Sequence, residues 1–132
     1  MYCENLKEVK LHDSITSIGD NGFSSCTNLK NIDLPDSITS IGEQGFLGCR
    51  ELTSINLPKN LVTIGEEAFQ SCSKLIKVTM SQNLKAIGNS AFRYCSALKD
   101  IDLPSQLTSL GNSVFSGCKA LESITIPGSV KK

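Results

Sequence analysis

The chain has 132 residues, enough for one ordinary domain, and 13 Lys and Arg residues balance 13 Asp and Glu residues to a formal net charge of zero. This balance leaves no basic surplus for a nucleic-acid interface or for an anionic membrane surface. No apolar run is long enough to cross a bilayer, and the first residues hold no apolar block typical of a secretory signal.

The chain repeats a short unit from its first cysteine onward. Leucine follows each cysteine after three residues, and an isoleucine, a glycine and a phenylalanine recur at the same interval in nearly every unit. Such regularity predicts stacked units that share one core, because none can bury its apolar side chains alone. We expect a single domain over residues 1–132, with five full repeats at 3–117 and a partial sixth at 118–132. The cysteines, spaced 23 residues apart, are Cys3, Cys26, Cys49, Cys72, Cys95 and Cys118.

The first half of each unit predicts a half-buried strand. In the second unit Leu29, Ile32 and Leu34 would point inward, whereas Asn31 and Asp33 would point to solvent. Stacked copies of this strand at about 4.8 Å spacing would form a parallel sheet.

The second half of each unit begins with another apolar residue and a glycine, which we expect to turn the chain. The residue after the glycine is acidic or Asn, and such residues suit a helix start. A single helical turn ending at Phe-x-x-Cys would then lead to the next strand. The residues expected to start these turns are Asp20, Glu43, Glu66, Asn89 and Asn112.

Two interpretations of the six cysteines compete. Small extracellular domains often use cysteines as a disulfide framework. An in-register stack, however, would place all six thiols in one inward column with parallel Cβ vectors, which fit disulfide geometry poorly. We therefore expect buried, reduced thiols. No Cys-x-x-Cys occurs and His12 is the only imidazole, so neither a metal site nor a cofactor is expected.

The residues do not predict an enzyme. With His12 alone, a nucleophile would have no plausible base, and no glycine-rich phosphate loop occurs. Asp100 and Asp102 form a carboxylate pair on one strand, but a glycosidase-like pair would need a cleft between them. A solvated strand face accounts for both acids.

The third unit carries a recognisable motif, Leu-Pro-x-x-Leu-x-x-Ile-Gly-x-x-Ala-Phe-x-x-Cys-x-x-Leu, which resembles the BspA-like (Treponema pallidum-type) leucine-rich repeat family. The resemblance covers essentially the whole chain, with mild departures at His12, Met80, Ser81 and Val114. The motif residues are Leu57, Pro58, Leu61, Ile64, Gly65, Ala68, Phe69, Cys72 and Leu75.

This resemblance implies a right-handed α/β-type leucine-rich repeat solenoid. A parallel β-sheet would cover its concave face, with short helical or 3-10 turns and irregular or short-strand segments on the convex side. The family also implies surface or secreted proteins of bacteria and parasitic protists, associated with adhesion to host proteins or other cells.

A protein partner is therefore expected on the outward side of the strands, where the side chains differ from unit to unit while the inward residues stay the same in type. No nucleic acid and no membrane insertion are expected. Ile76 and Tyr94 are the apolar residues expected outside the core, and either could anchor a partner. The predicted binding residues are Glu8, Lys10, Asn31, Asp33, Ser54, Asn56, Ile76, Lys77, Thr79, Asp100, Asp102, Ser123 and Thr125.

Neither end of the chain resembles the capping unit with which repeat arrays normally finish. We expect a segment of a longer array, or ends that associate with one another. The alternative function is thus a structural spacer or a scaffold that self-assembles through its ends.

Overall fold

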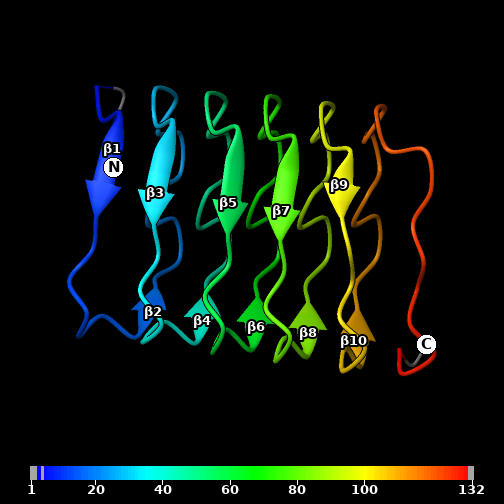
Figure 1. The fold of residues 1–132 in the computed structure, drawn as a ribbon. Helices are drawn as coiled ribbons and strands as arrows, with labels where there is room; N and C mark the ends of the chain where they lie inside the picture. The colour runs from blue at the N-terminus through cyan, green and yellow to red at the C-terminus, as the bar shows by residue number, and fades with distance from the viewer. Residues whose placement is uncertain (1–2, 4, 131–132) are drawn as a thin grey trace.

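The computed structural model describes residue 3 and residues 5–130. In it the chain winds into a stack of coils, and two rows of short strands run along the stack (Figure 1). The long-strand row comprises β1 (Glu8–Lys10), β3 (Asn31–Asp33), β5 (Ser54–Asn56), β7 (Lys77–Thr79) and β9 (Asp100–Ile101). The short-strand row comprises β2 (Ser17–Ile18), β4 (Ser40–Ile41), β6 (Thr63–Ile64), β8 (Ala86–Ile87) and β10 (Ser109–Leu110). The predicted parallel-strand solenoid is confirmed.

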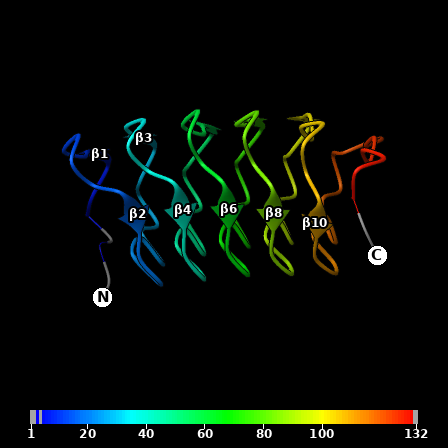
Figure 2. The ribbon, with the colours of Figure 1, turned by 90° about the horizontal axis from the view of Figure 1, so that it is seen from below.

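All strand pairings are parallel and join residues one repeat apart, as in Glu8 with Asn31 and Lys77 with Asp100. The short-strand row is one five-stranded sheet (Figure 2), whereas the long-strand row divides into β1–β3 and β5–β7–β9. Because the repeat interval sets the register, each position of the unit becomes a column along the stack. The sixth strand, expected to carry Ser123 and Thr125, is absent from the described residues.

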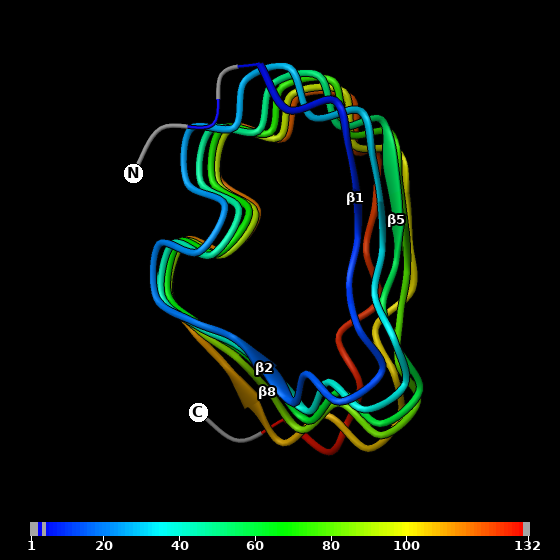
Figure 3. The same cartoon turned by 90° about the vertical axis from the view of Figure 1, so that its left-hand side faces the viewer.

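The core lies between the two rows, as the view along the stack shows (Figure 3). The rings of Phe46, Phe69 and Phe92 are fully buried and nearly parallel, with centroids 5.1 and 5.2 Å apart. Leucines and isoleucines of successive coils pack in columns beside them. Each coil therefore buries its apolar side chains against its neighbours.

The predicted helical turn is wrong, because no helix occurs among the described residues. In the third coil, Glu67 and Ser71 instead adopt left-handed φ values of 56° and 64°. Their N–H groups donate to the carbonyls of Asn89 and Arg93 in the next coil, at 2.9 and 2.8 Å, while Gln70 donates to Glu67 within the turn at 3.1 Å. A left-handed φ interrupts an α-helix, and the Ser71 N–H, which a helical turn would direct to the carbonyl of Glu67, bonds to the next coil instead.

The glycine after the second apolar residue has a different role from the predicted turn former. Gly42, Gly65, Gly88 and Gly111 have no left-handed φ. A Cβ atom on Gly65 would lie 2.6 Å from the carbonyl carbon of Gly42 and 2.7 Å from the amide nitrogen of Glu43. Glycine is therefore required because the backbones of adjacent coils approach closely.

At two positions, Asp20 and Asn89, the polar residue after this glycine also acts between coils and does not cap a helix. The Oδ1 atom of Asp20 accepts the N–H of Glu43 at 2.8 Å. The Oδ1 atom of Asn89 accepts the N–H of Asn112 at 2.7 Å. The predicted helix-capping role is thus wrong, although the expected chemistry, a side-chain oxygen accepting a backbone N–H, is present.

Candidate functional site

The outward side chains of the long-strand row form the candidate binding surface, here called the long-strand face. Exposure alternates along each strand: in β3, Ile32 points inward and is 8% exposed, whereas Asn31 and Asp33 are exposed. The same alternation holds in β5 and β7. The face comprises Glu8, Lys10, Asn31, Asp33, Ser54, Asn56, Lys77, Thr79, Asp100 and, just after β9, Asp102, all of them exposed and all predicted.

Charge is unevenly distributed over the long-strand face. The middle strand β5 carries only the uncharged Ser54 and Asn56, so the charged side chains lie on the coils to either side of it. Lys77 and Asp100 form an ion pair at 3.8 Å, with side chains 57% and 60% exposed. A pair so open to water contributes little to stability. These charges are therefore available to a partner.

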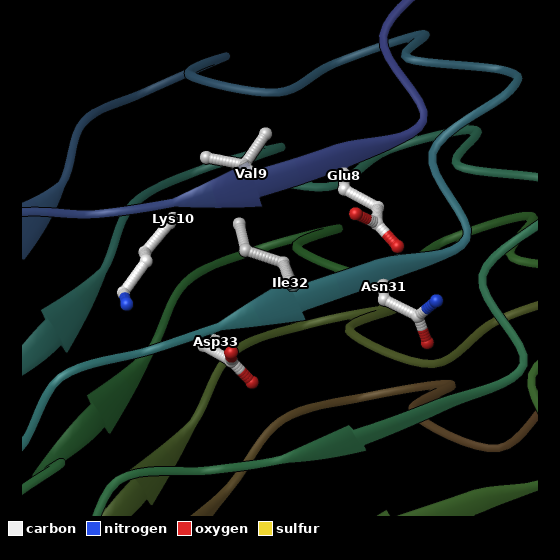
Figure 4. Close-up of a pocket in the computed structure, with 6 residues that line it drawn as sticks. All are labelled: Glu8, Val9, Lys10, Asn31, Ile32 and Asp33. Carbon is white, nitrogen blue, oxygen red and sulfur yellow. The ribbon is translucent and has the colours of Figure 1, made fainter.

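Two hollows indent the face at its charged parts. The first, of about 550 Å³, lies over β1 and β3 (Figure 4) and is lined by Glu8, Lys10, Asn31 and Asp33 above Val9 and Ile32. Glu8 lies beside Asn31 at one end, and Lys10 lies towards Asp33 at the other.

The second hollow, of about 260 Å³, lies over β7 and the start of β9. Lys77, Thr79, Gln82, Asp100 and Asp102 are among its lining residues. The strand alternation of the sequence does not predict Gln82, because this residue lies in the turn after β7.

The structure separates some predicted residues from the long-strand face. Ser123 and Thr125 are exposed but lie on no strand, and Thr125 lines a hollow of about 230 Å³ together with Asp102. Ile76 lies just before β7 and is 48% exposed, and Tyr94 is 47% exposed in the turn before Cys95. The predicted exposure of both apolar residues is confirmed.

The cysteines form the expected inward column, but not all of them are free thiols. Cys49, Cys72, Cys95 and Cys118 are buried free thiols, and each donates an S–H···O bond to the carbonyl of the phenylalanine 26 residues earlier, at 3.0–3.2 Å. The expectation that all six are reduced is wrong, because Cys3 and Cys26 form a disulfide.

The backbone geometry permits this disulfide. The Cα atoms of Cys3 and Cys26 lie 4.7 Å apart, within the range that a disulfide spans.

Burial suppresses the acidity of three of the free thiols, Cys49, Cys72 and Cys118. It raises the pKa of Cys49 from 9.0 to about 12 and that of Cys118 to about 11, and it also raises the pKa of Cys72. Since the thiolate is the reactive form, these side chains are unsuited to nucleophilic chemistry near neutral pH.

Thiol titration tests the whole column. We expect no thiol to react with a disulfide reagent in the folded protein near pH 8, about four to react after unfolding without reductant, and all six after reduction. Six reactive thiols without reductant would contradict the disulfide.

The pH dependence of stability follows from the same pKa shifts. The thiols of Cys49 and Cys118 deprotonate near pH 9.0 in the unfolded chain, whereas in the folded protein they keep their protons to about pH 12 and about pH 11. The contribution of these two buried thiols to the free energy of unfolding is therefore complete below pH 9.0 and is lost as the pH rises towards 12. Thermal unfolding followed between these values would measure the loss.

Two kinds of feature are lacking in the described part of the chain. No three His, Cys, Asp or Glu side chains there are grouped so that they could hold a metal ion. No helix in that part is long and apolar enough to cross a membrane.

Comparison with known proteins gives a family match and several similar structures. The model of the BspA type leucine rich repeat region matches residues 1–122 in six copies. No curated protein sequence matches the chain. The T. pallidum leucine rich repeat protein is 35% identical with a TM-score of 0.92, and the match covers 96% of this chain and 60% of that one.

Two further crystal structures are similar to this chain. A leucine-rich repeat protein from Bacteroides ovatus is 30% identical with a TM-score of 0.86, over 97% of this chain and 39% of that one. A leucine rich cell surface protein from Faecalibacterium prausnitzii is 23% identical with a TM-score of 0.52, over 97% of this chain and 55% of that one, a likeness of fold alone. The chain thus spans 39–60% of the length of these three proteins.

Proposed function

The chain belongs to the BspA type leucine rich repeat family, and from this premise we propose that it is a protein-binding module that presents its long-strand face to a protein partner. One observation carries the proposal. The outward side chains of the long strands are all exposed and differ from coil to coil, whereas the inward ones repeat as Val or Ile. Packing constrains only the inward side, so the outward side is free to be selected for recognition.

We further propose that the partner is a host protein or another cell-surface protein and that the module acts in adhesion at the cell surface. The F. prausnitzii structure is described as a cell surface protein, which supports this location by similarity of fold. A rigid parallel sheet supports recognition as well, because binding groups held by a regular backbone lose little entropy when they bind.

A charge reversal on the long-strand face tests the proposal. We expect Asp100→Lys with Asp102→Lys to weaken binding to a protein partner by about tenfold or more, because both carboxylates line one hollow of the face. Binding would be measured by biolayer interferometry against immobilised extracellular-matrix proteins and intact cells. The melting temperature should change little, since both side chains are exposed.

The matched control reverses two exposed acids away from this face, Glu43→Lys with Glu66→Lys, and should bind as the wild type does. The proposal would be contradicted if the Glu43→Lys, Glu66→Lys variant lost binding while the Asp100→Lys, Asp102→Lys variant still bound.

A further inference from the structure

The two hollows of the long-strand face share one arrangement of charge. Each holds a lysine opposite an aspartate of the next coil in the sheet register: Lys10 opposite Asp33, and Lys77 opposite Asp100. Each also holds one further carboxylate, Glu8 in the first hollow and Asp102 in the second. Both hollows therefore contain two carboxylates and one ammonium group, an excess of one negative charge.

Ion pairs within the chain neutralise little of this excess negative charge. Among the described residues, Glu8, Asp33 and Asp102 take part in no ion pair, and the Lys77–Asp100 pair is 3.8 Å long and widely exposed. Exchanging such a pair for a partner's guanidinium costs little. Arginine is favoured over lysine here, because its planar fork can donate to two carboxylates at once.

The distance between the hollows limits the shape of the partner. Three coil steps separate β1 from β7, which amounts to about 14 Å at a strand spacing of about 4.8 Å. Four residues of an extended chain also span about 14 Å at roughly 3.4 Å each. Between the hollows lie Ser54 and Asn56, whose side chains can hydrogen-bond to a peptide backbone.

The rest of the face restricts where such a segment can lie. Exposed Lys7, Lys30 and Lys99 precede β1, β3 and β9, so the side of the face where the strands begin is basic. A cationic segment would be repelled there. It would be attracted most where β9 ends, at Asp102, and less at Asp33, because Lys10 lies opposite Asp33 at the end of β1.

We infer that the long-strand face binds an extended, basic polypeptide segment whose two arginines, four residues apart, occupy the two hollows. The inference rests on the proposed function and specifies the chemistry of the partner.

Two labelled peptides of identical composition test the spacing: Gly-Arg-Ser-Ser-Ser-Arg-Gly and Gly-Arg-Arg-Ser-Ser-Ser-Gly. In fluorescence polarisation at low ionic strength, the spaced peptide should bind about fivefold more tightly or better, because it alone reaches both hollows. Asp33→Asn with Asp102→Asn should abolish the difference. The control Glu66→Gln, an exposed acid in a turn, should preserve it.

Equal affinity for the two peptides, or a preference that survives Asp33→Asn with Asp102→Asn, would overturn the inference. If the peptides fail to discriminate while Asp100→Lys with Asp102→Lys still loses a protein partner, only the inference fails. If partner binding instead depends on Glu43 and Glu66, the proposed function itself fails.

Discussion

Replacing Gly65 with alanine is expected to lower the free energy of unfolding by about 3 kcal/mol or more, the upper range for overpacking. The added methyl carbon would lie 2.6 Å from the carbonyl carbon of Gly42 and 2.7 Å from the amide nitrogen of Glu43. Both are backbone atoms of the preceding coil, so neither can rotate away. The two coils would have to separate, which would weaken the sheet and the core between them. Urea denaturation would measure the loss.

Alanine substitutions at two other glycines distinguish the effect of this close contact from the effect of backbone strain. Gly19→Ala should change stability little, because nothing lies within 4 Å of its added Cβ atom. Gly48 has a φ of +72° and its nearest neighbour would be 3.8 Å away, so Gly48→Ala should cost only the left-handed penalty of about 1–2 kcal/mol. If Gly65→Ala cost no more than Gly48→Ala, close backbone approach would not explain the glycine column.

The repeat interval was enough to predict the register and the long-strand face. An exact interval leaves one in-register stacking, so Glu8 must pair with Asn31, and alternation then decides that Asn31 and Asp33 point outward while Ile32 is buried. Side-chain directions in a strand depend on local pattern alone. For that reason, ten of the thirteen predicted binding residues lie on the face as expected.

The turns could not be predicted in the same way, because their conformation depends on partners outside the unit. Glu67 and Ser71 are left-handed while their N–H groups bond to the next coil. A sequence read one unit at a time instead favours a helical turn. The disulfide between Cys3 and Cys26 could not be predicted either, because the column position is identical in every unit and the sequence does not distinguish these two cysteines from the other four.

The phenylalanine stack should show how strongly neighbouring coils depend on one another. Phe69→Ala is expected to lower the free energy of unfolding by about 3–5 kcal/mol. The ring is fully buried and stacks on Phe46 and Phe92 with interplanar angles of 4° and 1°. The cavity would therefore open between two pairs of coils at once.

Phe23→Ala is the matched control, because Phe23 is partly exposed and, among the described residues, stacks on Phe46 alone, at 5.4 Å. Its loss should cost about half as much. In a stack stabilised by nearest-neighbour contacts, a central defect can uncouple the coils on its two sides, whereas a defect near one end leaves the others coupled. The urea m-value should consequently fall for Phe69→Ala and stay near the wild-type value for Phe23→Ala. Equal losses of stability at the two positions would mean that the coils do not stabilise one another through this column.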